Sequence, residues 1–252
     1  MKVIITGTTG MVGEGVLLEC LQNPEVTEIL SVSRNPIGIS HRKLKELIIP
    51  DFSKLPENDK RLTGYDACFY CAGISSYGKT EEEYRHITYD TTLAFAKALK
   101  PNSKLTFIYV SGGGTDSSEK GRSMWARVKG KTENDLFKLP FKQAFGFRVG
   151  IMEPIEGQKR VLGYYGYVSW LFPLIRIVLP KIINKMQEVG QAMIYLTKNG
   201  YEKSVIKVED VTILSRQRGV NARVIFLLIL HTVFQYQSFL EESRMTLFNL
   251  MA

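Results

Sequence analysis

The sequence predicts an α/β protein built on a doubly wound parallel sheet, with a small C-terminal region beside the sheet and a helical tail. Short apolar runs of strand length alternate with stretches long enough to form helices. The first apolar run ends in a glycine-rich turn, after which the apolar spacing changes from that of a strand to that of a helix. The 252 residues are 44% hydrophobic and 23% charged, which is typical of a globular domain.

The N-terminal segment has the pattern of a strand, a turn and a helix. Val3–Ile5 is an apolar run typical of a buried strand, and the turn Gly7–Gly13 follows it directly. From Val12 onward, apolar residues recur at helical spacing until Asn23 and Pro24 interrupt the pattern. The chain is therefore expected to pass from the first strand through the turn into the first helix.

Strands and helices then continue to alternate. Further strands are expected at Ile29–Val32, Leu47–Ile49, Ala67–Cys71, Leu105–Val110 and Phe145–Val149. Helices are expected at Tyr89–Leu99 and Ser123–Leu136. Strands separated by helices run parallel, so this count predicts one doubly wound sheet.

The pattern loosens beyond Gly150. Residues 151–200 contain an aromatic stretch and an amphipathic segment, which we interpret as a substrate-side region, and Val205–Val208 is expected to form a last strand. We place a main domain at 1–215, including 151–200, and a C-terminal helical extension at 216–252. The apolar run of the extension, residues 224–234, is too short to cross a bilayer as a helix, so no membrane span is expected. Packing on the body or on a second subunit, as in a homodimer, would cover it, and a membrane contact is the alternative.

Charge and cysteine content narrow the class of protein. The net charge of +8 comes from basic residues scattered along the chain, so no nucleic-acid partner is expected. Cys20, Cys68 and Cys71 suggest no disulfide framework, and no secretory signal is recognisable, so a cytoplasmic protein is expected. The three histidines have no metal-ligand spacing, so no metal is expected.

The glycine-rich turn carries the main functional prediction. Its first glycine permits a tight turn, the second lets a diphosphate approach the backbone, and the third lets helix and strand pack closely. A diphosphate would then lie at the positive end of the helix. The position between a strand and an amphipathic helix favours this interpretation over a chance turn. The predicted cofactor-binding residues of this turn are Gly7, Thr8, Thr9, Gly10, Met11, Val12 and Gly13.

The residue after the second predicted strand bears on the choice of cofactor. An acidic side chain there would bind the ribose hydroxyls of NAD, whereas a basic one would accommodate the 2′-phosphate of NADP. The sequence has Arg34 at this place, between Ser33 and Asn35. NADP(H) is therefore the preferred cofactor and NAD(H) the alternative, unless Arg34 is only a solvated loop charge.

On these motifs the chain resembles the short-chain dehydrogenase/reductase superfamily, in its atypical or extended branch of NAD(P)-binding, epimerase/dehydratase-like Rossmann proteins. The resemblance covers residues 1–215. It implies adenine contacts at Asp51 and Phe52, and contacts beside the adenine ribose at Cys71, Ala72 and Gly73.

The resemblance also implies catalytic residues. Ser111 matches the family's catalytic serine, and Lys129 matches its Tyr-x-x-x-Lys lysine, which also holds the nicotinamide ribose. The family's tyrosine position holds Trp125, whose indole cannot transfer a proton usefully. The usual asparagine is replaced by Thr88. A replacement phenol could come from Tyr109, Tyr164, Tyr165 or Tyr167, although core packing is the simpler interpretation of each.

Two functions follow from these features. The first is an NADP(H)-dependent oxidoreductase or epimerase-like enzyme that acts on a small carbonyl or alcohol. The second is a catalytically impaired regulatory or interaction protein that binds NADPH without turnover, because Trp125 replaces the family tyrosine.

Overall fold

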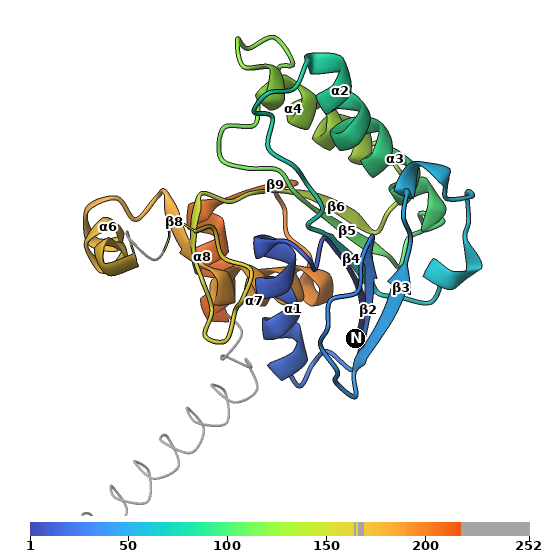
Figure 1. Cartoon of the computed structure of the whole chain (residues 1–252), viewed down its shortest axis with the longest axis horizontal. Coiled ribbons are helices and arrows are strands. Elements are labelled where there is room, and N and C mark those ends of the chain that lie inside the picture. Colours follow the sequence, from blue (N-terminus) through green and yellow to red (C-terminus); the bar gives the residue numbers. More distant parts are fainter. Residues whose placement is uncertain (164, 166–168, 218–252) are drawn as a thin grey trace, which may run out of the picture. The chain divides into compact units, whose positions relative to one another are not determined.

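The computed structural model describes residues 1–163, 165 and 169–217 (Figure 1). Within these residues, seven parallel strands form one sheet in the order β3-β2-β1-β4-β5-β6-β9. The strands are β1 Lys2–Thr6, β2 Glu28–Ser33, β3 Leu44–Ile48, β4 Ala67–Tyr70, β5 Thr106–Val110, β6 Gln143–Arg148 and β9 Val205–Lys207. This doubly wound parallel sheet confirms the expected fold class.

Helices lie on both faces of the sheet. They are α1 Met11–Gln22, α2 Glu81–Arg85, α3 Thr91–Ala98, α4 Met124–Leu136, α6 Phe172–Val178, α7 Met186–Asn199 and α8 Val208–Arg216. Figure 1 shows α1, α7 and α8 on one side of the sheet and α2, α3 and α4 on the other. Short 3₁₀ turns occur at Phe52–Lys54, Lys60–Leu62 and Ser169–Leu171.

The core consists of two apolar clusters, one on each face of the sheet. Successive side chains of a strand point to opposite faces, so Val3 and Ile5 join the cluster under α1 and α7, whereas Ile4 joins the cluster under α3. Cys68 and Cys71 likewise belong to opposite clusters and are free thiols. Strands buried on both faces explain the continuous apolar runs in the sequence.

The helix expected at Tyr89–Leu99 is longer than the apolar spacing indicated. It begins at Glu81, where Thr80 and Glu83 form a reciprocal capping box with bonds of 2.9 and 3.3 Å. A π-helical turn, His86–Asp90, then joins α2 to α3. The first turn is acidic and carries no apolar periodicity, so only its cap marks the helix in the sequence.

Two further differences concern short strands. The edge strand β3 begins earlier than the expected Leu47–Ile49, and its exposed Lys45 and Glu46 hide it from an apolar pattern. In the region after Gly150, β7 (Ile151–Glu153) pairs in parallel with β8 (Ile183–Lys185). Three-residue strands whose partners lie far along the chain leave little local signal.

The chain divides into two units, Met1–Ser215 and Arg216–Ala252. The elements above belong to the first unit, apart from the last residue of α8. Residues 218–252 lie outside the described residues, so the helical extension and its apolar run stay predictions, as do the domain roles of 1–215 and 216–252. In the described part of the chain, no helix has both the length and the apolar character needed to cross a membrane.

Candidate functional site

A pocket of about 500 Å³ opens at the carboxyl ends of β1, β2 and β4. The strand order reverses between β1 and β4, and such a switch point is where open α/β sheets bind ligands. The pocket brings together nine of the predicted cofactor residues: Gly7, Thr9, Gly10, Arg34, Asp51, Phe52, Cys71, Ala72 and Gly73. It is also lined by His86, Ile87 and Thr91, which the sequence analysis did not select.

The glycine-rich turn has the geometry that its spacing predicts. Gly7 has a φ of +67°, and a Cβ there would lie 2.7 Å from the backbone nitrogen of Ala72. A Cβ on Gly13 would overlap the carbonyl oxygen of Gly7, so only glycine lets α1 start this close to β1. The Gly10 N–H donates to that same carbonyl at 2.9 Å, and α1 begins at the next residue.

The other residues of the turn pack against neighbouring elements and not into the pocket. The Thr8 hydroxyl is buried and lies 2.7 Å from the Ser31 hydroxyl of β2. Met11 packs against a small apolar cluster of the substrate-side region that includes Tyr165. Val12 packs against the core under α1. These side chains and Gly13 do not line the described pocket, so their contribution is to the shape of the turn.

The end of the pocket beside β2 and β3 combines a cation with a capped turn. Arg34 is exposed and follows β2 directly, where the Ser33 hydroxyl donates to the Asn35 carbonyl at 2.7 Å. Asp51 accepts the backbone N–H and hydroxyl of Ser53 at 3.0 and 2.6 Å. The hydroxyl bond is the largest of the contacts that lower the pKa of Asp51. This carboxylate therefore stabilises its own turn.

The segment after β4 closes the pocket from the other side. The Ala72 N–H donates to the Thr6 hydroxyl at 3.1 Å, which ties the end of β4 to the end of β1. Burial raises the pKa of the Cys71 thiol to about 12, so this thiol stays neutral at physiological pH. Phe52 is buried, and its ring packs 5.0 Å from the ring of Phe95.

Ser111 and Lys129 come together at the carboxyl end of β5. The Lys129 ammonium group donates to the Ser111 carbonyl oxygen, while the Ser111 hydroxyl donates to Glu133 at 2.5 Å. Burial is the main cause that lowers the pKa of Lys129 to about 8, and the nearby Glu133 charge opposes the shift. The serine hydroxyl thus points into the protein in this structure.

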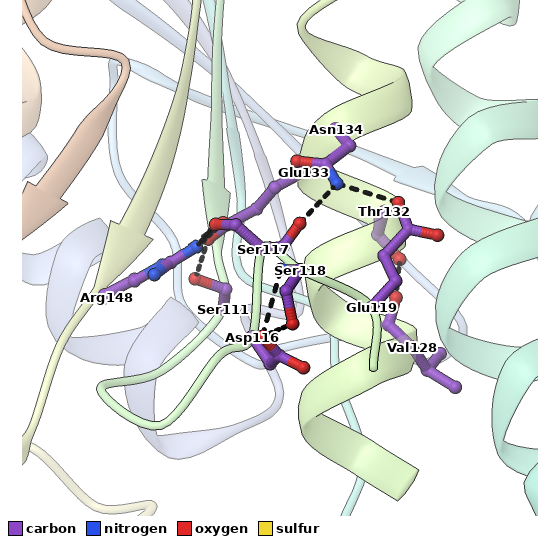
Figure 2. A network of polar contacts seen from close by, with 10 residues as sticks. All are labelled: Ser111, Asp116, Ser117, Ser118, Glu119, Val128, Thr132, Glu133, Asn134 and Arg148. Carbon is purple, nitrogen blue, oxygen red and sulfur yellow. Dashed lines mark hydrogen bonds and ion pairs between the residues drawn. The ribbon is translucent and has the colours of Figure 1, made fainter. Parts of the chain in front are cut away.

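Glu133 and Arg148 form a buried ion pair that the sequence analysis missed. Glu133 is 0% exposed, and Arg148 of β6 donates to it through Nε at 3.1 Å and through a terminal nitrogen at 2.5 Å. A Cβ on Gly146 would overlap the Glu133 carboxylate. Figure 2 shows this pair converging on Ser111. The only sequence signal is that Glu133 lies one helical turn after Lys129.

The position of the missing tyrosine is filled by a large ring. Trp125 is partly buried, and a Cβ on Gly114 would lie 2.7 Å from its indole. Gly114 therefore makes room for the indole. Thr88, which stands at the asparagine position, is buried on the π-helical turn.

The candidate replacement phenols differ in accessibility. Tyr109 is 2% exposed, and burial raises its pKa well above the ordinary value. Tyr165 packs against Phe172, with ring centroids 5.5 Å apart. Tyr164 and Tyr167 lie outside the described residues. Tyr109 and Tyr165 thus have the environment of core side chains.

Sequence comparison identifies the relatives of the chain. No protein-family model matches it. "Protein fmp52, mitochondrial" of Emericella nidulans is 30% identical over 165 residues, which cover 63% of this chain and 68% of the relative. The chain belongs to the FMP52 family. The FMP52 protein of Eremothecium gossypii is 23% identical over 237 residues, covering 88% of this chain and all of that protein.

Solved structures similar to this FMP52-family chain share its fold. Uronate dehydrogenase from Agrobacterium tumefaciens superimposes with a TM-score of 0.58 at 12% identity, covering 81% of this chain and 74% of the enzyme. UDP-glucuronic acid 4-epimerase from Bacillus cereus, in complex with UDP-glucuronic acid and NAD, gives 0.56 at 16%, covering 87% and 83%. These likenesses confirm the expected Rossmann-type fold, which the chain shares with solved dehydrogenases and epimerases.

The family corrects one expectation. The FMP52 relatives are named mitochondrial, so the expectation of a cytoplasmic protein is wrong. That expectation rested on the low cysteine content, which suits a reducing compartment, and on the lack of a recognisable secretory signal. Neither observation distinguishes the cytoplasm from other intracellular compartments. Among the described residues, no group of three or more His, Cys, Asp or Glu side chains is placed to hold a metal ion.

Proposed function

We propose that this chain binds a nicotinamide dinucleotide, with a preference for NADP(H), and acts as an oxidoreductase on a small carbonyl or alcohol. The 500 Å³ pocket at the β1/β4 switch point is the observation that carries the proposal. Gly7 and Gly10 line this pocket without side chains, which leaves the backbone of the turn open to a diphosphate, so the residues present fit the group.

The proposed roles follow from position along the pocket. The start of α1 at Gly10 presents backbone N–H groups to the diphosphate, and the helix dipole favours its negative charge. Phe52 and the segment after β4 flank the adenosine, while Arg34 at the pocket rim is the side chain available to a 2′-phosphate. The NADP(H) preference rests on Arg34.

The proposed chemistry lies near Lys129. A bound nicotinamide supplies or accepts the hydride, and Lys129, beside Gly112 at the end of β5, donates to the ribose hydroxyls and fixes the ring's position. Polarisation of the substrate oxygen by Ser111 requires its hydroxyl to turn away from Glu133. Turnover of a carbonyl substrate panel with NADPH would support this role, and a bound cofactor without any turnover would contradict it.

Replacing Arg34 with Asp tests the cofactor preference. We expect the native chain to bind NADPH more tightly than NADH in a nucleotide-fluorescence titration. The substitution should weaken NADPH binding by about 10-fold to 100-fold, because a charged hydrogen bond worth roughly 1.5–3 kcal/mol is replaced by repulsion. NADH affinity should be retained or improved, because an acidic residue suits the ribose hydroxyls.

The matched control is Arg42→Asp. Arg42 is also exposed but does not line the pocket, so this variant makes the same charge change elsewhere on the surface. It should bind both nucleotides as the native chain does. Equal loss of NADPH binding in the two variants would assign the effect to net charge, and no binding by the native chain would overturn the proposed function.

The second candidate is an NADPH-binding regulatory protein without turnover. Two observations favour it: Trp125 occupies the tyrosine position, and the Ser111 hydroxyl is engaged by Glu133. Replacing Trp125 with Tyr separates the two functions in a reductase assay. A gain of activity would indicate a binding site that has lost its acid, whereas loss of a native activity would show that the indole belongs to a working site.

A further inference from the structure

We propose that Glu133 and Arg148 form a buried positioning pair, which holds Ser111 and thereby fixes the ammonium group of Lys129 at the end of β5. The proposal rests on the proposed function for its consequence, which is cofactor binding, but its geometry is independent of that function. Figure 2 shows the pair between the end of β5, helix α4 and strand β6.

The first step is the hold on Ser111 from two sides. Its hydroxyl donates to Oε1 of Glu133 at 2.5 Å, and its carbonyl accepts the Lys129 ammonium group. Its backbone N–H donates to the Phe147 carbonyl at 3.0 Å, which continues the pairing of β5 with β6. The strand pairing places this carbonyl, and the Glu133 contact adds a second hold on the same residue that receives the lysine.

The second step is the hold on Glu133 itself. The carboxylate is wholly buried and accepts hydrogen bonds from both Ser111 and Arg148, so the positions of its oxygens are fixed. Gly146 provides the space that the carboxylate occupies. Arg148 also contacts the Ser117 hydroxyl, which ties the pair to the loop between β5 and α4.

The loop between β5 and α4 is also held by hydrogen bonds from α4 itself. The Asn134 side chain donates to the Ser117 carbonyl at 3.0 Å and to Glu119 at 2.7 Å (Figure 2). Adjacent residues of α4 thus serve different purposes: Glu133 acts on Ser111, and Asn134 acts on the loop. Together they hold both ends of the segment that begins at Ser111.

The charged groups near Lys129 lie on two different faces of α4. Glu133 lies one turn along the same face of α4, and its charge raises the pKa of Lys129 against the larger effect of burial. Arg148 and Tyr109, from β6 and β5, interact with Glu133. The charged groups of α2 and the π-helical turn contact the other face, where Glu81 pairs with Arg127 at 2.6 Å and Tyr89 donates to Asp135 at 2.7 Å. Glu133 is thus the charge set to act on Lys129.

The test is an NMR titration of Lys129 in the full chain labelled with ¹³C at the lysine Cε, with the signal assigned by its loss in Lys129→Arg. The native midpoint is expected near 8. In Glu133→Gln the midpoint should fall by about half a pH unit or more, because the anion that favours the charged lysine is removed. A carboxylate that does not act on Lys129 would leave the midpoint unchanged, and an unchanged midpoint overturns the proposal.

Two further variants keep the test decisive. Asp210→Asn removes another buried carboxylate, one that pairs with Lys203 at 2.9 Å in the β9–α8 region, and should not move the Lys129 midpoint. The double variant Glu133→Gln/Arg148→Gln removes both members of the ion pair, so Arg148 is not left without its carboxylate, and it serves if the single variant does not fold. Its midpoint should fall by less than in Glu133→Gln, because loss of the Arg148 cation offsets part of the effect, and a midpoint at or above the native value in the folded double variant overturns the proposal.

Cofactor binding separates this proposal from the proposed function. NADPH affinity of the native chain should decrease as the pH rises through about 8, because neutral Lys129 is a weaker donor to ribose hydroxyls, and the decrease should begin at lower pH in Glu133→Gln. A shifted lysine midpoint without NADPH binding at any pH would support the positioning pair and overturn the proposed function. NADPH binding with an unshifted lysine midpoint would support the proposed function and overturn the positioning pair.

Discussion

Replacing Gly13 with alanine should reduce NADPH affinity by about 100-fold or more, equivalent to about 2.7 kcal/mol. The new Cβ would overlap the Gly7 carbonyl oxygen, which also accepts the Gly10 N–H at 2.9 Å. Because the atoms in conflict are backbone, α1 or the turn must move, and the N–H groups that face the diphosphate move with them. Fluorescence titration with NADPH measures the loss.

The same substitution should also destabilise the fold, by about 1–3 kcal/mol in urea denaturation, because overpacking a tight contact displaces its surroundings. Gly163→Ala is the matched control, since a Cβ there meets no atom within 4 Å and the backbone is not left-handed. That variant should match the native chain in both measurements. Native NADPH affinity in Gly13→Ala would contradict the role of the turn, even if stability had decreased.

Replacing Glu133 with Gln should lower the free energy of unfolding by about 3–5 kcal/mol, the largest effect on stability that we expect. The Arg148 side chain is only 13% exposed, and two of its nitrogens donate hydrogen bonds to the Glu133 carboxylate. The substitution removes that carboxylate's negative charge. A buried charge without a partner is costly because water no longer solvates it. Urea or thermal denaturation, followed by circular dichroism, measures the change.

An exposed ion pair provides the comparison. Lys198 and Glu25 also approach to 2.6 Å, but their side chains are 48% and 36% exposed. Glu25→Gln should therefore cost less than about 1 kcal/mol. Similar losses in Glu25→Gln and Glu133→Gln would show that burial of the Glu133 pair adds nothing, and would remove the energetic basis for its role.

Much of the fold could be predicted because its signals are local. A strand buried on both faces produces a continuous apolar run, as in β1, and a helix packed on a sheet produces a repeat every three or four residues, as in α1. Where the signal was not apolar, prediction was weaker: α2 is marked only by its cap at Thr80, and β3 is masked by Lys45 and Glu46.

The candidate cofactor pocket was also largely predictable. Its glycines, Arg34 and the segment after β4 all follow the carboxyl ends of parallel strands, and a parallel sheet brings those ends to one edge. His86 and Thr91 were missed because they reach the pocket from helical segments. Their place depends on how the helices pack over the sheet.

The sequence by itself determined the order of the main strands and helices, the glycine turn and nine of the residues that gather at the switch point, because each depends on local spacing and on the geometry of a parallel sheet. Only the tertiary structure decided what the Ser111 hydroxyl contacts. Its partner Glu133 lies 22 residues away, and Arg148 lies a further 15 residues along the chain. Packing α4 against β5 and β6 brings these groups together. The buried carboxylate is tolerated there because a cation and a hydrogen-bond donor lie within reach.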